Sequence, residues 1–245
     1  MVALGQKYQS QVSLLVQKRP KSSVPVGGVF LRIKLNLQIF IFLIIFYFTN
    51  QIDIYVTLIL FALIHEVAHI VVGIIYGLKP KTLKITPFGI SIYFEKYKRN
   101  GKKILEKQKI IIALAGPIIN IAIAVGIMFL PSNIFIHISQ ENLILANLLL
   151  ALFNLIPIYP LDGGRIINSI LSLKKIDKKN NIILTEKISY ICLIILTLIA
   201  SLVILILQNI AIFFIIIYLW LLVLQQIKYN RLRLRVFEML KVNSE

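Results

Sequence analysis

The chain has 245 residues, of which 58% are hydrophobic, and a mean hydropathy of +0.87, which together exclude an ordinary soluble domain. Its formal charge of +17 comes from 27 Lys and Arg residues against 10 Asp and Glu. Because these basic residues cluster between apolar blocks of membrane-spanning length, the charge does not indicate a nucleic-acid binding protein, and we predict no nucleic-acid partner.

Residues 1–29 predict a flexible leader, because prolines, serines and glycines concentrate in it and no apolar core precedes a cleavage site. We predict one membrane domain over residues 30–227 and a basic interfacial tail over residues 228–245. The apolar blocks predict six transmembrane helices, at residues 35–50, 54–76, 109–130, 142–159, 188–207 and 210–227.

The second span carries the motif His65-Glu66-Val67-Ala68-His69 in the middle of its apolar stretch. Residues four apart lie on one helix face, so both imidazoles can bind one zinc ion while Glu66 serves as general base. Ionisable groups at membrane depth are costly unless they are paired, metal-bound or face a wet cavity. The motif therefore predicts one Zn²⁺ per chain and a zinc-dependent peptidase, against the alternative of two ordinary buried histidines.

Residues 82–95 predict a β-hairpin at the cytoplasmic mouth, because apolar and polar residues alternate there and Pro87 and Gly89 interrupt the run. An exposed strand edge at that place could pair with an extended substrate. A hairpin with no substrate role fits the same pattern equally well, and both interpretations stay open.

The third span contains Gly116, Pro117 and Asn120. We interpret Gly116 and Pro117 as residues that allow close helix packing, as we do Gly73 and Gly77 of the second span. Asn120 could hydrogen-bond into a site cavity or simply between helices, and the sequence supports either interpretation.

The fourth span is predicted to break near its end. Pro157 and Pro160 forbid regular helix, and the two glycines after Asp162 allow backbone turns that other residues resist. Non-helical backbone at membrane depth survives where it is buried in protein or lines a wet cavity, which makes Asp162 a candidate third zinc ligand. The alternative is a surface turn past a helix end. The predicted fold is thus an all-α polytopic membrane protein with about six transmembrane helices, a broken fourth span and a small β-hairpin.

All 27 Lys and Arg residues fall on one side of the predicted spans: six before the first, ten between the second and third, six between the fourth and fifth, and five after the last. By the positive-inside rule, this predicts a multi-pass protein of the cell membrane with both termini in the cytoplasm, attracted to the lipid bilayer surface. Asp162 can then reach His65 and His69 if the fourth span unwinds at Pro157. His137 lies in the opposite, charge-free loop and is the weaker ligand candidate.

These motifs resemble those of the site-2 protease family of intramembrane zinc peptidases. The resemblance rests on residues 65–69 and on Asn154 through Arg165, takes in Pro87-Phe88-Gly89 and Ala115-Gly116-Pro117, and covers residues 30–240. Within the family the chain looks most like the bacterial stage IV sporulation branch, whose members cleave a membrane-tethered sigma-factor precursor. Some members of that branch carry a soluble nucleotide-sensing domain after the last span, and we expect none here.

The resemblance implies a zinc site of four residues: the ligands His65, His69 and Asp162 and the general base and proton shuttle Glu66. It implies that Asn154 and Pro160 shape the cavity and hold the substrate strand. It also implies regulated intramembrane proteolysis of a membrane-associated protein near the cytoplasmic face, with a sigma-factor precursor as substrate and inhibitory membrane proteins as partners.

A membrane metal-ion transporter is the alternative from another functional class. It would need metal ligands throughout the bilayer thickness, whereas the sequence contains one compact set. An inactive relative acting as a scaffold is a third hypothesis, and intact Glu66 and Asp162 disfavour it. Processing of an anti-sigma factor or another membrane protein is the alternative substrate class.

Overall fold

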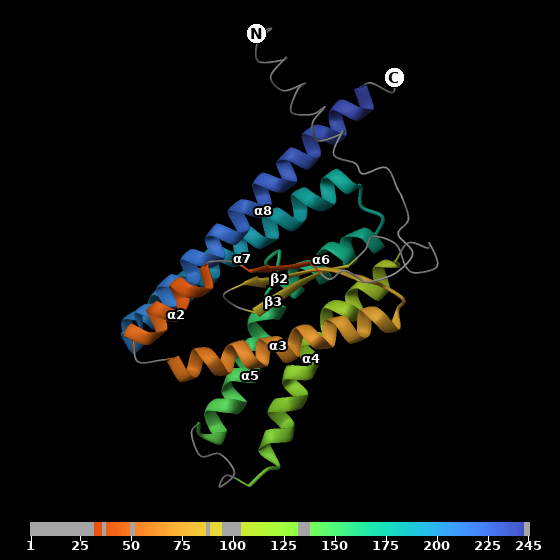
Figure 1. Ribbon diagram of the computed structural model, residues 1–245. Helices are drawn as coiled ribbons and strands as arrows, with labels where there is room; N and C mark the ends of the chain where they lie inside the picture. The colour runs from red at the N-terminus through yellow and green to blue at the C-terminus, as the bar shows by residue number, and fades with distance from the viewer. Residues whose placement is uncertain are drawn as a thin grey trace. The chain divides into compact units, whose positions relative to one another are not determined.

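The structure is a computed structural model that describes residues 32–35, 38–49, 52–86, 89–94, 104–131 and 138–242. The chain divides into two units, Met1–Phe30 and Leu31–Glu245, and the description below concerns the second. The predicted leader and His137 lie outside the described residues. In chain order the elements are β1 (Arg32–Leu35), α2 (Gln38–Phe48), α3 (Ile52–Ile75), β2 (Pro80–Thr86), β3 (Gly89–Phe94), α4 (Glu106–Met128), α5 (Gln140–Leu155), α6 (Asp162–Leu173), α7 (Lys178–Leu207) and α8 (Ile210–Val242) (Figure 1).

Four of the described helices, α3, α4, α7 and α8, are long and apolar enough to cross a membrane. They correspond to the second, third, fifth and sixth predicted spans. The other two predicted spans form the shorter helices α2 and α5, of 11 and 16 residues. At 1.5 Å per residue these reach only about 16 and 24 Å, less than the ~30 Å hydrocarbon core. The prediction of six spans is therefore confirmed for four helices, and for the other two the described helices are too short to cross alone.

The basic residues after position 227 extend α8, which continues as one helix to Val242. α7 likewise begins at Lys178, ten residues before the predicted start of the fifth span. Both helices therefore carry polar ends beyond their apolar segments. The two helices pack side by side (Figure 1).

Three strands form one small sheet in the order β1-β2-β3. β2 and β3 are antiparallel, with Lys84 opposite Ser91, and correspond to the hairpin predicted at residues 82–95. β1 pairs in parallel with β2 and was not predicted. A parallel pair needs a long connection, here through α2 and α3, so no local pattern reveals it. The part of the chain that the structure describes is therefore helical apart from this sheet.

Two glycines at the end of α3 have different roles. A Cβ on Gly73 would contact the ring of Phe94, so this glycine lets β3 pack closely against α3, whereas the prediction was close packing of another helix. Gly77 has a φ of +79°, and the N–H of Leu78 donates to the carbonyl of Gly73. That is a Schellman helix end, in which glycine adopts the left-handed conformation at no steric cost. The packing interpretation is therefore wrong for Gly77.

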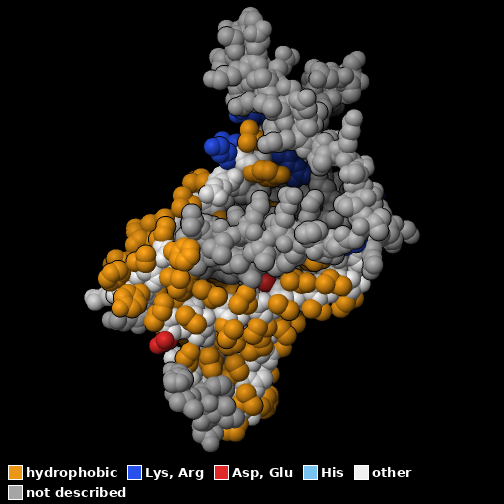
Figure 2. Space-filling view, in the orientation of Figure 1, with side chains coloured by type: hydrophobic (Ala, Val, Ile, Leu, Met, Phe, Trp, Pro, Cys, Tyr) orange, Lys and Arg blue, Asp and Glu red, His pale blue; other side chains and the backbone are white. Residues whose placement is uncertain are grey.

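Two buried clusters join the helices. In the first, Tyr55 of α3 stacks on Phe46 of α2 with 4.6 Å between ring centroids, and both pack against Tyr218 of α8. In the second, Ile158 from the segment after α5 packs against Leu193 of α7 and nearby residues of α8. Exposed hydrophobic side chains cover much of the helical surface, and Lys and Arg gather mainly above it in this view (Figure 2). Helices that are apolar outward as well as inward are typical of membrane proteins.

The chain breaks between α5 and α6, where the fourth span was predicted to break. Ile156, the residue before Pro157, has a ψ of 133°, outside the helical region, because the proline ring disfavours helix at the preceding residue. Helix resumes at Asp162, so the two glycines that follow lie in the first turn of α6. Their role is steric rather than conformational, since a Cβ on Gly163 would collide with the carbonyl oxygen of Leu155.

The segment between α5 and α6 is anchored to α7 by a hydrogen bond. The N–H of Tyr159 donates to Oγ of Ser189 at 2.9 Å, and Ser189 is 2% exposed. We expect Ser189→Ala to lower the free energy of unfolding by about 1–3 kcal/mol, because this N–H would lose its partner. Denaturation of the purified protein in detergent measures the change. Ser201→Ala is the control, since its exposed hydroxyl lies on the same helix, and equal stability of the two variants would contradict the prediction.

Candidate metal centre

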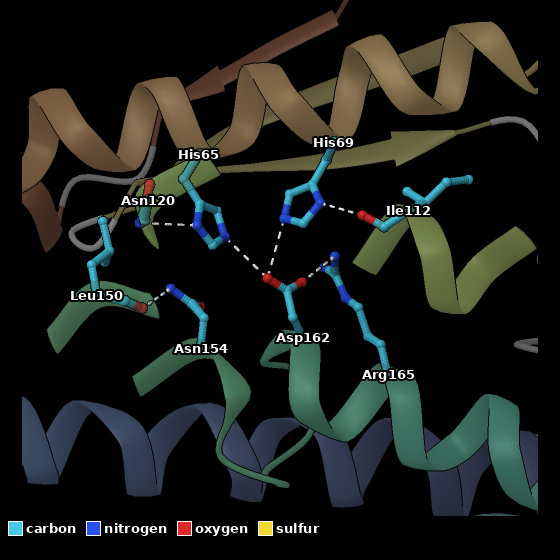
Figure 3. Close-up of polar contacts among 8 residues, drawn as sticks. All are labelled: His65, His69, Ile112, Asn120, Leu150, Asn154, Asp162 and Arg165. Carbon is cyan, nitrogen blue, oxygen red and sulfur yellow. Dashed lines mark hydrogen bonds and ion pairs between the residues drawn. The ribbon is translucent and has the colours of Figure 1, made fainter. Parts of the chain in front are cut away.

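Helix α3 places His65 and His69 on one face, as their spacing predicts. Each histidine is 3% exposed, and the ring centroids lie 4.8 Å apart. Both rings point toward Asp162 (Figure 3). Four-residue spacing thus brings two imidazole nitrogens to one buried place.

Asp162, the first residue of α6, meets both histidines. Its Oδ2 lies 3.0 Å from Nε2 of His65 and 3.1 Å from Nε2 of His69. The side chain is buried at 4% exposure, which excludes the alternative of a surface turn. The three predicted ligands are therefore brought together, with ligand atoms all within 4.8 Å of one another. Among the described residues this is the one such cluster of His, Cys, Asp and Glu side chains.

The cluster suits zinc in chemistry and in size. Two imidazole nitrogens and one carboxylate oxygen are a usual catalytic zinc set, which leaves a fourth position open. Ligands 2.0–2.1 Å from a tetrahedral zinc lie about 3.3 Å from each other, close to the two distances to Asp162. A Cβ on Gly116 of α4 would contact Nε2 of both histidines, so the absence of a side chain there keeps this space open. The close helix packing predicted for Gly116 is therefore observed, and the side chains that it packs against are the two histidines of α3.

Glu66 lies on α3 between the two histidines in sequence, and one of its carboxylate oxygens has no partner among the described residues. Its Oε2 is buried and has no hydrogen-bond partner among the described residues. A buried carboxylate oxygen without a partner is rare in a purely structural role. The arrangement fits a group that interacts with something bound at the site.

Helix α4 contacts each histidine on its other ring nitrogen. Nδ1 of His69 lies 2.6 Å from the carbonyl oxygen of Ile112, and Nδ1 of His65 lies 3.3 Å from Nδ2 of Asn120. Of the two roles left open for Asn120, the structure favours contact with the site. The Ile112 contact could not be predicted, because a backbone carbonyl has no sequence signature.

Arg165, one turn after Asp162, contacts the carboxylate oxygen that faces away from the histidines. Its Nη1 lies 3.5 Å from Oδ1 of Asp162. This guanidinium places a positive charge beside the Asp162 carboxyl group and so favours its ionised form, which is the form that binds metal.

A cavity of about 770 Å³ adjoins the cluster, between α3, α5, α7 and α8. Glu66, Asn154, Asp162 and Arg165 contribute polar groups to its lining, and most of the remaining lining is aliphatic or aromatic. Pro160 also lines the cavity. Nδ2 of Asn154 donates to the carbonyl of Leu150, one turn earlier in α5, at 2.9 Å (Figure 3). Both predicted substrate-contacting residues are thus at the cavity wall, and their roles stay predictions.

Comparison with known proteins gives consistent matches. Residues 133–200 match Peptidase family M50. A zinc metalloprotease of Methanocaldococcus jannaschii is 32% identical over 124 residues, 49% of this chain and 34% of the relative. Stage IV sporulation protein FB of Bacillus subtilis is 31% identical over 111 residues, 45% of this chain and 37% of the relative. The matched segments thus span about a third of the length of these curated relatives.

A solved structure matches over a longer range. The site-2 protease from Methanocaldococcus jannaschii superimposes with a TM-score of 0.61 and 25% identity, covering 83% of this chain and 94% of that chain. The archaeal and Bacillus relatives are almost equally identical to this chain, so the comparisons do not resolve a branch. The resemblance to the sporulation branch stays a prediction.

Proposed function

We propose that this chain belongs to the Peptidase M50 site-2 protease family and is an intramembrane zinc endopeptidase. The observation that carries the proposal is the convergence of His65, His69 and Asp162 at one buried point, beside Glu66 and a largely apolar cavity. Ionisable groups set among helices of membrane-spanning length are expected to serve a function.

The proposed roles follow from the chemistry of the side chains. His65, His69 and Asp162 would hold the ion, and zinc when bound would supply Lewis-acid polarisation of the scissile carbonyl and activation of water. Glu66 takes one proton from the attacking water as its oxygen bonds to the carbonyl carbon. Glu66 then delivers that proton to the amide nitrogen as the C–N bond breaks.

The cavity supports a substrate taken from the membrane. Its apolar lining suits aliphatic side chains, and the polar groups around Glu66 suit the peptide backbone. We propose that Asn154 and Pro160 hold the substrate as an extended strand, since peptidases cleave extended backbone. The edge of the β2–β3 hairpin is a second candidate for pairing with that strand.

The proposed location is a bacterial cell membrane with both termini in the cytoplasm. The segregation of all 27 Lys and Arg residues to one side of the predicted spans supports this orientation. Cleavage would then take place near the cytoplasmic face. The proposed substrate is a membrane-tethered sigma-factor precursor, with inhibitory membrane proteins as regulators, on the resemblance to the sporulation branch.

The described residues give little support to a metal-ion transporter. That function predicts further ligand groups along a path through the membrane, and the described part of the chain offers one cluster. Zinc flux in proteoliposomes without proteolysis of any membrane substrate would favour the transporter.

Metal removal tests the proposed reaction. We expect purified protein treated with a chelator to stop cleaving a membrane-tethered precursor, and to recover when one equivalent of Zn²⁺ per chain is returned. Gel analysis of the products and metal analysis of the protein measure the two quantities. Cleavage that continues in protein shown to be free of metal would contradict a zinc peptidase.

Co-expression in a heterologous bacterial host tests the substrate class. A sigma-factor precursor, an anti-sigma factor and an unrelated single-span protein are each produced with this chain. The proposal expects a shortened sigma factor and an intact unrelated protein. Processing of the anti-sigma factor alone would overturn the substrate assignment and leave the proposed reaction standing.

A further inference from the structure

Helix α4 touches both histidines on the ring nitrogen that faces away from Asp162 (Figure 3). For His69 the contact is the carbonyl oxygen of Ile112, and for His65 it is the side-chain amide of Asn120. The two contacts come from residues eight positions apart on α4, about two helical turns. One helix thus contacts both candidate ligands.

The Ile112 contact determines the tautomer of His69. A carbonyl oxygen can only accept a hydrogen bond, so a neutral His69 carries its proton on Nδ1 and presents the lone pair of Nε2. Metal-binding histidines commonly donate their second ring N–H to such an acceptor. Nε2 of His69 is therefore prepared to bind the ion.

His65 needs an acceptor of the same kind at Asn120. Asn120 is fully buried, with 0% exposure, and its Oδ1 has no hydrogen-bond partner among the described residues, while its Nδ2 faces the ring. A donor facing Nδ1 would leave the proton on Nε2, where the ion should bind. A half-turn of the amide exchanges the two atoms and pairs Oδ1 with an Nδ1–H.

We infer that Asn120 is a positioning residue for His65, whose Nδ1–H it receives through Oδ1, so that Nε2 of His65 can ligate zinc. This inference rests on the proposed zinc site. The hydrogen bond selects the tautomer and holds the ring in orientation, as the carbonyl of Ile112 does for His69.

Two variants of Asn120 test this role by their zinc affinity, measured by chelator competition on the metal-free protein. Asn120→Leu removes the acceptor and is expected to weaken zinc binding by about 10- to 100-fold. Asn120→Asp keeps an oxygen acceptor and should bind zinc within a few-fold of the wild type. Equal losses in both variants, or wild-type affinity in Asn120→Leu, would overturn the inference.

Asn147 provides a matched control. It is also 0% exposed, its Oδ1 likewise has no partner among the described residues, and its Nδ2 donates to its own helix α5 at the carbonyl of Leu143. Asn147→Leu should change stability without changing zinc affinity. If Asn147→Leu lost as much zinc affinity as Asn120→Leu, removal of any buried asparagine would lower zinc affinity. That result would overturn a specific role for Asn120.

Nitrogen NMR of the wild-type protein tests the inference without any substitution, so the result does not depend on whether a variant folds. The chain has only three histidines, so labelling them yields six ring nitrogens. In the zinc-loaded protein, His65 is expected to show a protonated Nδ1 and a metal-bound Nε2. Zinc on Nδ1, or an unprotonated Nδ1, would overturn the inference. Failure of the wild type to bind zinc at all would instead refute the proposed function.

Discussion

Glu66→Gln should abolish peptide cleavage while the protein keeps one zinc ion per chain. Glutamine is nearly the same size as glutamate, but its side-chain amide cannot accept and return a proton near neutral pH. A positioned general base contributes roughly 10²- to 10⁴-fold to rate, so a loss of at least about 100-fold is expected. The proposed ligands His65, His69 and Asp162 are unchanged, which is why zinc should remain. Cleavage rate and zinc content, measured on the same preparation, report the two effects separately.

Glu186→Gln serves as the control for removal of a carboxylate. Glu186 lies on α7, where its Oε1 accepts a hydrogen bond from Nδ2 of Asn230 at 2.9 Å, and it does not line the cavity. This variant should cleave at the wild-type rate. Cleavage by Glu66→Gln at a similar rate would refute the role of Glu66 as general base. Loss of zinc from Glu66→Gln would place Glu66 among the groups that hold the ion.

Gly116→Ala should weaken zinc binding by steric exclusion. The added Cβ would contact Nε2 of both His65 and His69, at the place where the ion is proposed to lie. Overpacking of a tight site costs about 1–3 kcal/mol, which corresponds to roughly 5- to 150-fold in zinc affinity. We expect the upper part of that range, because both contacts are to rings held on their far side by α4. Chelator competition measures the affinity.

Gly126→Ala controls for the same chemical change on the same helix. A Cβ there meets nothing within 4 Å. Because alanine favours helix over glycine by up to about 1 kcal/mol, this variant should be at least as stable as the wild type and bind zinc normally. Wild-type zinc affinity in Gly116→Ala would mean that the ion does not occupy the space between the two histidines.

Features that depend on neighbouring residues were predicted well. The spacing of His65 and His69 is a property of one helix, so their common face followed from the helical period alone. The break of the fourth span followed from Pro157, which acts on the residue beside it. The four long helices followed from the length of their apolar blocks. The bounds were less accurate, since α7 and α8 continue through polar residues that mean hydropathy cannot distinguish from loops.

The sequence by itself determined that the chain has apolar segments of membrane-spanning length and that a candidate metal-ligand pair and a candidate base share one helix. Only the tertiary structure decided that Asp162, 93 residues after His69, completes the cluster, and that Gly116 lies against both histidines. It also decided the contacts of Ile112 and Asn120 and the parallel pairing of β1. The physical reason is the separation of the contacting residues in the sequence. Helical and strand periods relate residues a few positions apart, whereas these contacts depend on how whole helices and strands pack.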